Sequence, residues 1–82
     1  MAKVKDKKTD GGTALIAEAL GVRSNTVPPD ARMGEFELWD SLAHLRILLT
    51  LEGALGRQLK AEEAVRIETV ADIDEALESQ RT

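Results

Sequence analysis

The sequence predicts an all-α fold: a small four-helix bundle with three main helices, one short helix and a long loop between the first two. Of the 82 residues, 43% are apolar, mostly Ala, Leu, Ile and Val, with one Phe, one Trp and no Tyr. This aliphatic composition favours helices and is too apolar for a disordered chain. An apolar run at helical spacing extends from Leu42 to Leu55. The chain length suits a single domain with a modest core.

The central helix is predicted over residues 41–55, because this run has no proline and no glycine before Gly53. Asp40 and Ser41 stand at its N-terminus, where side-chain oxygens can accept the free N–H groups of the first turn. The partial positive charge of a helix N-terminus also favours an anion, such as a phosphate ester on a serine. A serine here is usually only a cap, so the local sequence leaves both roles open.

Two apolar faces emerge when this helix is drawn at 100° per residue. Leu42, Leu45 and Leu49 form the face beside the serine. Either the helix is buried all round, or this face is exposed for partner proteins, which a bundle of this size favours. His44 falls on the core side, where a structural role is expected and a minor role near a phosphate is the alternative. The predicted core-facing residues are Ile47, Leu48, Leu51 and Leu55.

The segment before this helix is predicted to form a tail, a short helix and a loop. Residues 1–12 are rich in Lys and Asp and end in two glycines, so a flexible N-terminal tail is expected. Alternatively they extend the first helix, at about 2 kcal/mol for two glycines. Thr13 is the predicted cap of a helix that ends at Leu20, closed by Gly21. The long loop over residues 23–37 is expected to be pinned to the bundle by apolar side chains within it and just after it: Val27, Met33, Phe36, Leu38 and Trp39.

The C-terminal part is predicted to hold one short and one longer helix. Residues 61–67 form the short one. Thr69 caps the last helix, with Asp72 three residues on in an arrangement like a capping box. Residues 79–82 are expected to fray, which leaves residues 13–78 as the folded domain. The last helix has a single apolar stripe, formed by Val70, Ile73 and Leu77.

Composition excludes several classes of function. From residue 13 onward there are seven basic and thirteen acidic residues, whereas nucleic-acid-binding proteins present a basic face. Without cysteine there is no disulfide, thiolate nucleophile or cysteine metal site. The acidic residues match no calcium loop and the single histidine forms no catalytic triad, so no metal site and no catalytic residue are predicted. No window reaches the ~18 apolar residues of a membrane span, and no signal peptide is apparent, so a cytoplasmic protein is expected.

The triplet Asp40-Ser41-Leu42 resembles the attachment motif of acyl and peptidyl carrier proteins. The Trp-Asp-Ser-Leu form with His44 is similar to discrete carriers of specialised pathways, and Leu20-Gly21-Val22 is similar to the end of their first helix. The resemblance covers roughly residues 13–78 and implies the carrier-protein fold. It implies that Ser41 carries a 4′-phosphopantetheine arm derived from coenzyme A, with Asp40 and Leu42 beside the attachment point. The docking residues that it implies are Leu42, Leu45, Arg46 and Leu49.

What the resemblance implies is a monomeric carrier that is not an enzyme and that holds acyl or aminoacyl groups as thioesters. Its expected partners are a phosphopantetheinyl transferase, an acyl- or aminoacyl-loading ligase and downstream biosynthetic enzymes, and not nucleic acid or membrane. Carriers of fatty acid synthases have acidic residues after the serine, where this chain has Ala43, His44 and Arg46, so a specialised pathway is favoured. The alternatives are a housekeeping fatty acid carrier, an aminoacyl or peptidyl carrier, and a helical interaction module without a prosthetic group.

Overall fold

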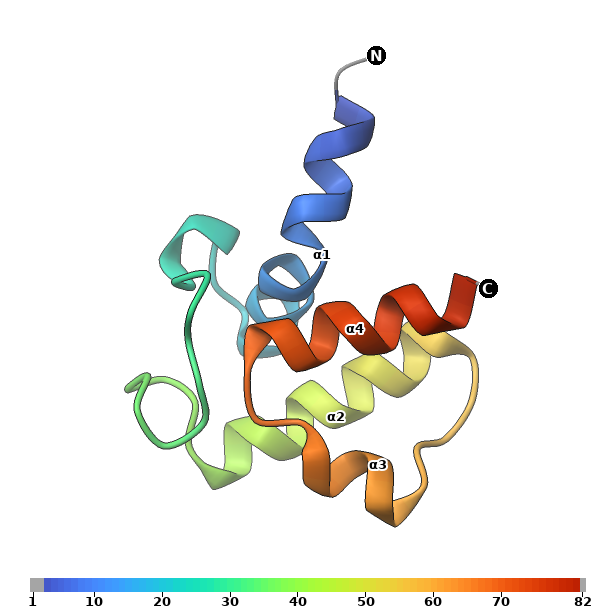
Figure 1. Cartoon of the computed structure of the whole chain (residues 1–82). Helices are drawn as coiled ribbons and strands as arrows, with labels where there is room; N and C mark the ends of the chain where they lie inside the picture. The colour runs from blue at the N-terminus through green and yellow to red at the C-terminus, as the bar shows by residue number, and fades with distance from the viewer. Residues whose placement is uncertain (1–2, 82) are drawn as a thin grey trace.

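The computed structural model describes the backbone of residues 3–81 and the side chains of residues 11–79. Its four α-helices are α1 (Lys3–Leu20), α2 (Ser41–Leu55), α3 (Ala61–Arg66) and α4 (Val70–Arg81), with a short 3-10 turn at Ser24–Thr26. Figure 1 shows α2 and α4 crossing the bundle, with α3 on one side and α1 reaching away toward the N-terminus. The predicted all-α bundle with a long loop between its first two main helices is confirmed.

Local sequence explains where the later helices begin and end. The α4 start forms the predicted capping box, because Asp72 N–H donates to Thr69 Oγ1 at 3.1 Å and Thr69 N–H donates to Asp72 Oδ2 at 3.0 Å. The α2 end is closed by Gly56, whose φ of 76° lies in the left-handed region that glycine adopts without strain. The short α3 matches its predicted span to within one residue.

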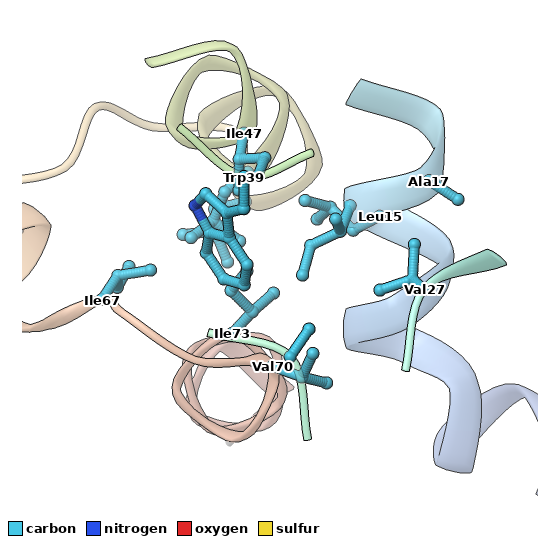
Figure 2. Packing of buried hydrophobic residues seen from close by; sticks show 12 residues of the cluster. Leu15, Ala17, Val27, Trp39, Ile47, Ile67, Val70 and Ile73 are labelled. Carbon is cyan, nitrogen blue, oxygen red and sulfur yellow. The ribbon is translucent and has the colours of Figure 1, made fainter. Parts of the chain in front are cut away.

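The core lies where α1, α2 and α4 meet, together with the loop before α2 and the segment after α3. Trp39 occupies its centre in Figure 2, close to Ile47 of α2, Ile73 of α4 and Ile67. The predicted stripe of α4 is confirmed, since Val70 and Ile73 are buried and Leu77 packs against them. The largest fully buried side chains are Trp39, Ile16, Ile47, Leu51 and Ile73.

The expected start of the first helix at Thr13 is wrong, because α1 already begins at Lys3 and runs through both glycines. Gly12 is buried, and its N–H donates to Asp74 Oδ1 of α4 at 2.6 Å. A side chain at this position would collide with the backbone of Val70, so the glycine allows α1 and α4 to approach closely. The glycine pair therefore does not break the helix: the alternative holds, in which these residues extend α1, and Gly12 allows its packing on α4. The mobility of residues 1–12 stays a prediction, and residues 1–2 and 82 lie outside the described part.

The long loop is held at both ends, although not by all the predicted residues. Val27 and Trp39 are buried and Phe36 packs against the core, as expected. Met33 and Leu38 are exposed, so the prediction that they pin the loop is wrong. Backbone hydrogen bonds hold this part of the loop instead. Met33 N–H donates to Glu68 O at 2.8 Å, and Val70 N–H donates to Ala31 O at 3.3 Å.

Candidate functional site at the start of helix α2

Ser41 is the first residue of α2, and its side chain is exposed. Asp40 precedes it in an extended conformation and caps the helix, since its Oδ1 accepts the N–H of Ala43 at 2.9 Å. The first N–H groups of a helix have no partner within the helix, so those of Ser41 and Leu42 remain available to an anion attached at this end. Because Asp40 does the capping, the Ser41 hydroxyl is not needed for it.

Trp39 and His44, which lie on either side of Ser41 in the sequence, contact each other. The indole Nε1–H of Trp39 donates to Nδ1 of His44 at 2.9 Å, and the two rings stack with their centroids 6.0 Å apart. Since Nδ1 accepts, neutral His44 carries its proton on Nε2. The pair links the residue before Asp40 to the first turn of α2 and satisfies a buried N–H group. His44 is half-buried, as expected, and its hydrogen bond to Trp39 supports a structural role.

The pKa of His44 is lowered by its burial, against a smaller opposite effect of the Glu68 carboxylate. The neutral form is favoured when the protein is folded, so His44 contributes stability that is complete above its ordinary pKa of 6.5. That contribution is lost as the pH falls below 6.5 toward the lowered pKa, since only the unfolded chain binds the proton there. A protonated Nδ1 would also face the Trp39 N–H as a second donor.

We therefore expect His44→Asn to flatten the dependence of stability on pH below pH 6.5. Its Oδ1 can accept the Trp39 N–H but does not titrate in this range. His44→Ala should instead lower the free energy of unfolding by about 1–3 kcal/mol at neutral pH, because it leaves a buried donor unpaired. Urea unfolding curves between pH 5 and pH 8 measure both effects. An unchanged pH slope in His44→Asn would contradict this assignment.

An exposed apolar strip follows the serine along α2. The side chains of Leu42, Leu45 and Leu49 are 63%, 53% and 58% exposed, as the two-face pattern predicts. The opposite face is buried through Ile47, Leu51 and Leu55, as predicted, while Leu48 is half-buried and packs against the core. Three exposed leucines on one helix face form the kind of patch that marks a protein-protein contact.

Arg46 is the only charged residue on this strip, and its side chain is exposed. Glu52, the one acid of α2, is engaged elsewhere, because its Oε2 accepts the N–H of Leu59 at 2.8 Å. The strip therefore combines an apolar surface with a single positive charge. Leu38, just before α2, is also exposed and lines the same pocket as Leu42, although it was expected to pin the loop to the bundle; its position next to a tryptophan gave no signal of exposure.

A shallow pocket of about 230 Å³ adjoins this strip, where the end of α1 meets the start of α2. Leu20 and Val22 line it from the α1 side, and Leu42 and Arg46 from α2. No local sequence pattern predicts this pocket, because residues about twenty positions apart form it. Leu38 and Asp40 complete its rim.

Three other acidic side chains, those of Glu63, Asp72 and Asp74, stabilise the fold. Bidentate hydrogen bonds from Arg57 to Glu63, at 3.0 and 2.9 Å, are the largest cause that lowers the pKa of Glu63 to about 2, followed by the N–H of Lys60. Asp72 caps α4, and Asp74 accepts the N–H of Gly12. Within the described part of the chain, no three His, Cys, Asp or Glu residues gather to hold a metal ion. None of the helices described there is long and apolar enough to cross a membrane.

Comparison with known proteins identifies the family to which this chain belongs. No family model matches the chain. It is 32% identical over 68 residues to the acyl carrier protein of Helicobacter hepaticus, a match that covers 83% of this chain and 90% of that protein. It is 33% identical over 60 residues to the acyl carrier protein of Thermosynechococcus vestitus, covering 73% and 74%. Proteins with this name are carriers rather than enzymes. With its helical bundle and its likeness to these two proteins, the chain belongs to the acyl carrier protein family.

Proposed function

We propose that Ser41 carries a 4′-phosphopantetheine arm and that the chain holds acyl or aminoacyl intermediates as thioesters on it for a specialised biosynthetic pathway. The observation that carries this proposal is the exposed Ser41 hydroxyl on the first residue of α2, next to an independent cap. Membership of the acyl carrier protein family supports the carrier role. The thiol that the chain lacks comes with the arm, whose terminal sulfur forms the thioester.

The residues around Ser41 suit a phosphate diester. The free N–H groups of the first turn and the helix dipole favour negative charge at the serine oxygen. The Asp40 carboxylate is turned to the N–H of Ala43, so it stabilises the first turn while the serine is modified. A phosphopantetheinyl transferase would deliver the arm from coenzyme A and needs access to the hydroxyl from solvent, which exposure of Ser41 provides.

Ser41→Ala should abolish uptake of phosphopantetheine and leave the fold intact. Alanine removes the only oxygen that the proposal uses, while Asp40 keeps the cap, so the free energy of unfolding should fall by about 1 kcal/mol at most. Intact mass after incubation with coenzyme A and a broad-specificity transferase measures uptake, and thermal melting measures the fold.

Ser24→Ala is the matched control, because Ser24 is also exposed but lies in the loop turn. It should gain one arm, as the unmodified chain does. Uptake of phosphopantetheine by Ser41→Ala would show that the arm is attached to another residue. No uptake by the chain without substitutions would favour an interaction module without a prosthetic group.

The charge of the exposed strip supports a specialised pathway over housekeeping fatty acid synthesis. Arg46 is the only charged side chain among Leu42, Leu45, Arg46 and Leu49, so a partner with an acidic group directly opposite it would be attracted to this part of α2, although the exposed Asp40 carboxylate lies at the start of the helix. The proposed docking residues are Leu42, Leu45, Arg46 and Leu49, and the proposed partners are a loading ligase and later enzymes of the pathway.

Arg46→Glu should improve use of the loaded carrier by fatty acid synthase enzymes and weaken use by its own loading enzyme. The change places an acid on an exposed site, so stability should change by less than about 0.5 kcal/mol. Arg46→Gln is the control that removes charge without reversing it, and it should give intermediate rates. Mass-detected acyl transfer at two salt concentrations tests the idea; an effect that salt does not reduce would not be electrostatic.

A further inference from the structure

We propose that Trp39 closes the interior of the bundle to the cargo, so that the acyl group is carried outside it and belongs to the class of short or polar acyl and aminoacyl groups. This inference rests on the proposed attachment at Ser41. It assigns Trp39 a role in selecting the cargo, beyond its part in the core.

An apolar chain at the end of the arm would be stabilised by burial, because leaving water is favourable for apolar surface. The core begins close by, since Trp39 lies only two residues before Ser41. Whether the bundle can take up the chain therefore depends on what fills the interior at this end.

The indole of Trp39 fills it. The side chain has no exposed surface and is the largest of the fully buried ones. Figure 2 shows it between Ile47 of α2, Ile73 of α4 and Ile67, which follows α3. Protein interiors are close-packed, so an acyl chain could enter here only if the indole moved aside.

His44 holds the indole in this position. Their 2.9 Å hydrogen bond fixes the Nε1 end of the ring, and the imidazole lies beside that end, with the two ring planes 27° apart. Displacing the ring to admit a chain would break this bond and leave its buried N–H unpaired. The interior is thus closed by packing and by a specific polar contact.

Among the described residues, the surface near Ser41 has no cavity that could bury an acyl chain as the interior of the bundle would. The pocket beside Asp40 is shallow, and Leu42, Leu45 and Leu49 are themselves exposed to water. A long apolar chain carried there would stay hydrated, whereas a short chain or one with polar groups needs no burial. The chemistry of this end of the bundle therefore fits short or polar cargo.

The test loads Ser41 with acetyl- or octanoyl-4′-phosphopantetheine from the matching acyl-coenzyme A, which releases adenosine 3′,5′-bisphosphate. Melting temperature, fluorescence of the single tryptophan and thioester lifetime in hydroxylamine are compared for the two forms. We expect equal melting temperatures, an unchanged Trp39 spectrum, and an octanoyl thioester that reacts as fast as octanoyl-coenzyme A. A higher melting temperature or a protected thioester in the octanoyl form would overturn the inference.

Trp39→Leu should reverse the result, because it opens space next to Ile47 and Ile67 at the serine end. Octanoyl loading should then raise the melting temperature and slow the reaction with hydroxylamine; no change would show that Trp39 is not the barrier. Leu55→Ala is the control, with its cavity at the other end of α2, and should not respond. If Trp39→Leu does not fold, Trp39→Phe replaces it. The comparison of the acetyl- and octanoyl-loaded forms of the chain without substitutions still decides whether the interior takes up the acyl group. Absence of any mass gain would reject the proposed function itself.

Discussion

Leu51→Ala should lower the free energy of unfolding by about 2–5 kcal/mol, one of the largest effects of any single truncation in this chain. Leu51 is fully buried in the third turn of α2, and alanine would remove its contacts and leave a cavity between packed helices. Small domains have only about 5–15 kcal/mol of stability, so this change alone could remove much of it. Urea unfolding at neutral pH measures the loss.

Leu49→Glu lies two residues away and should have the opposite profile. Its side chain is 58% exposed, so a carboxylate stays hydrated there and the melting temperature should hardly change. Arm transfer or later loading should become slower, because a docking partner would have to desolvate the new charge. If Leu49→Glu unfolds the chain as strongly as Leu51→Ala, the strip is part of the core and the docking proposal fails.

The contrast between these leucines shows what the sequence determines by itself. Spacing at 100° per residue separates Leu51 from Leu49 because both belong to one regular helix, and exposure in the structure agrees with that separation. The capping box of α4 was predictable for the same reason, since Thr69 and Asp72 are neighbours in sequence. Ser41 was predictable as a helix start, whereas the proposal that it is modified depends on the family resemblance.

Features made by distant residues could not be predicted. The pairing of Met33 with Glu68 joins a loop to the start of α4, and neither residue carries a local signal for it. The hydrogen bond between Trp39 and His44 depends on the rotamers of both rings, although the short separation of the two residues hinted at proximity. Leu38 and Met33 are apolar yet exposed, because the backbone pairing, and not their side chains, holds the loop.

The prediction that Gly11 and Gly12 precede the first helix is wrong for a related reason. The low helix propensity of glycine is a local property, whereas the close packing that Gly12 allows depends on α4, which lies far away in the sequence. A Cβ at Gly12 would lie 2.8 Å from the Val70 carbonyl oxygen and 2.7 Å from Asp74 Oδ1. The backbone oxygen cannot rotate away, so the helices would have to separate. A Cβ at Gly11 would make only ordinary contacts, at 3.5 Å from Leu77 Cδ1.

Gly12→Ala should therefore lower the free energy of unfolding by about 1–3 kcal/mol, since it forces α1 from α4 and weakens the 2.6 Å bond to Asp74. Gly11→Ala is the matched control in the same helix and should raise it by up to about 1 kcal/mol through helix propensity. Opposite shifts in the melting temperatures of the two variants would support the close packing of α1 on α4. Stabilisation by both would mean that α1 does not pack closely on α4 at Gly12, and no change in either would mean that the glycines belong to a flexible tail, with the folded domain starting only at residue 13.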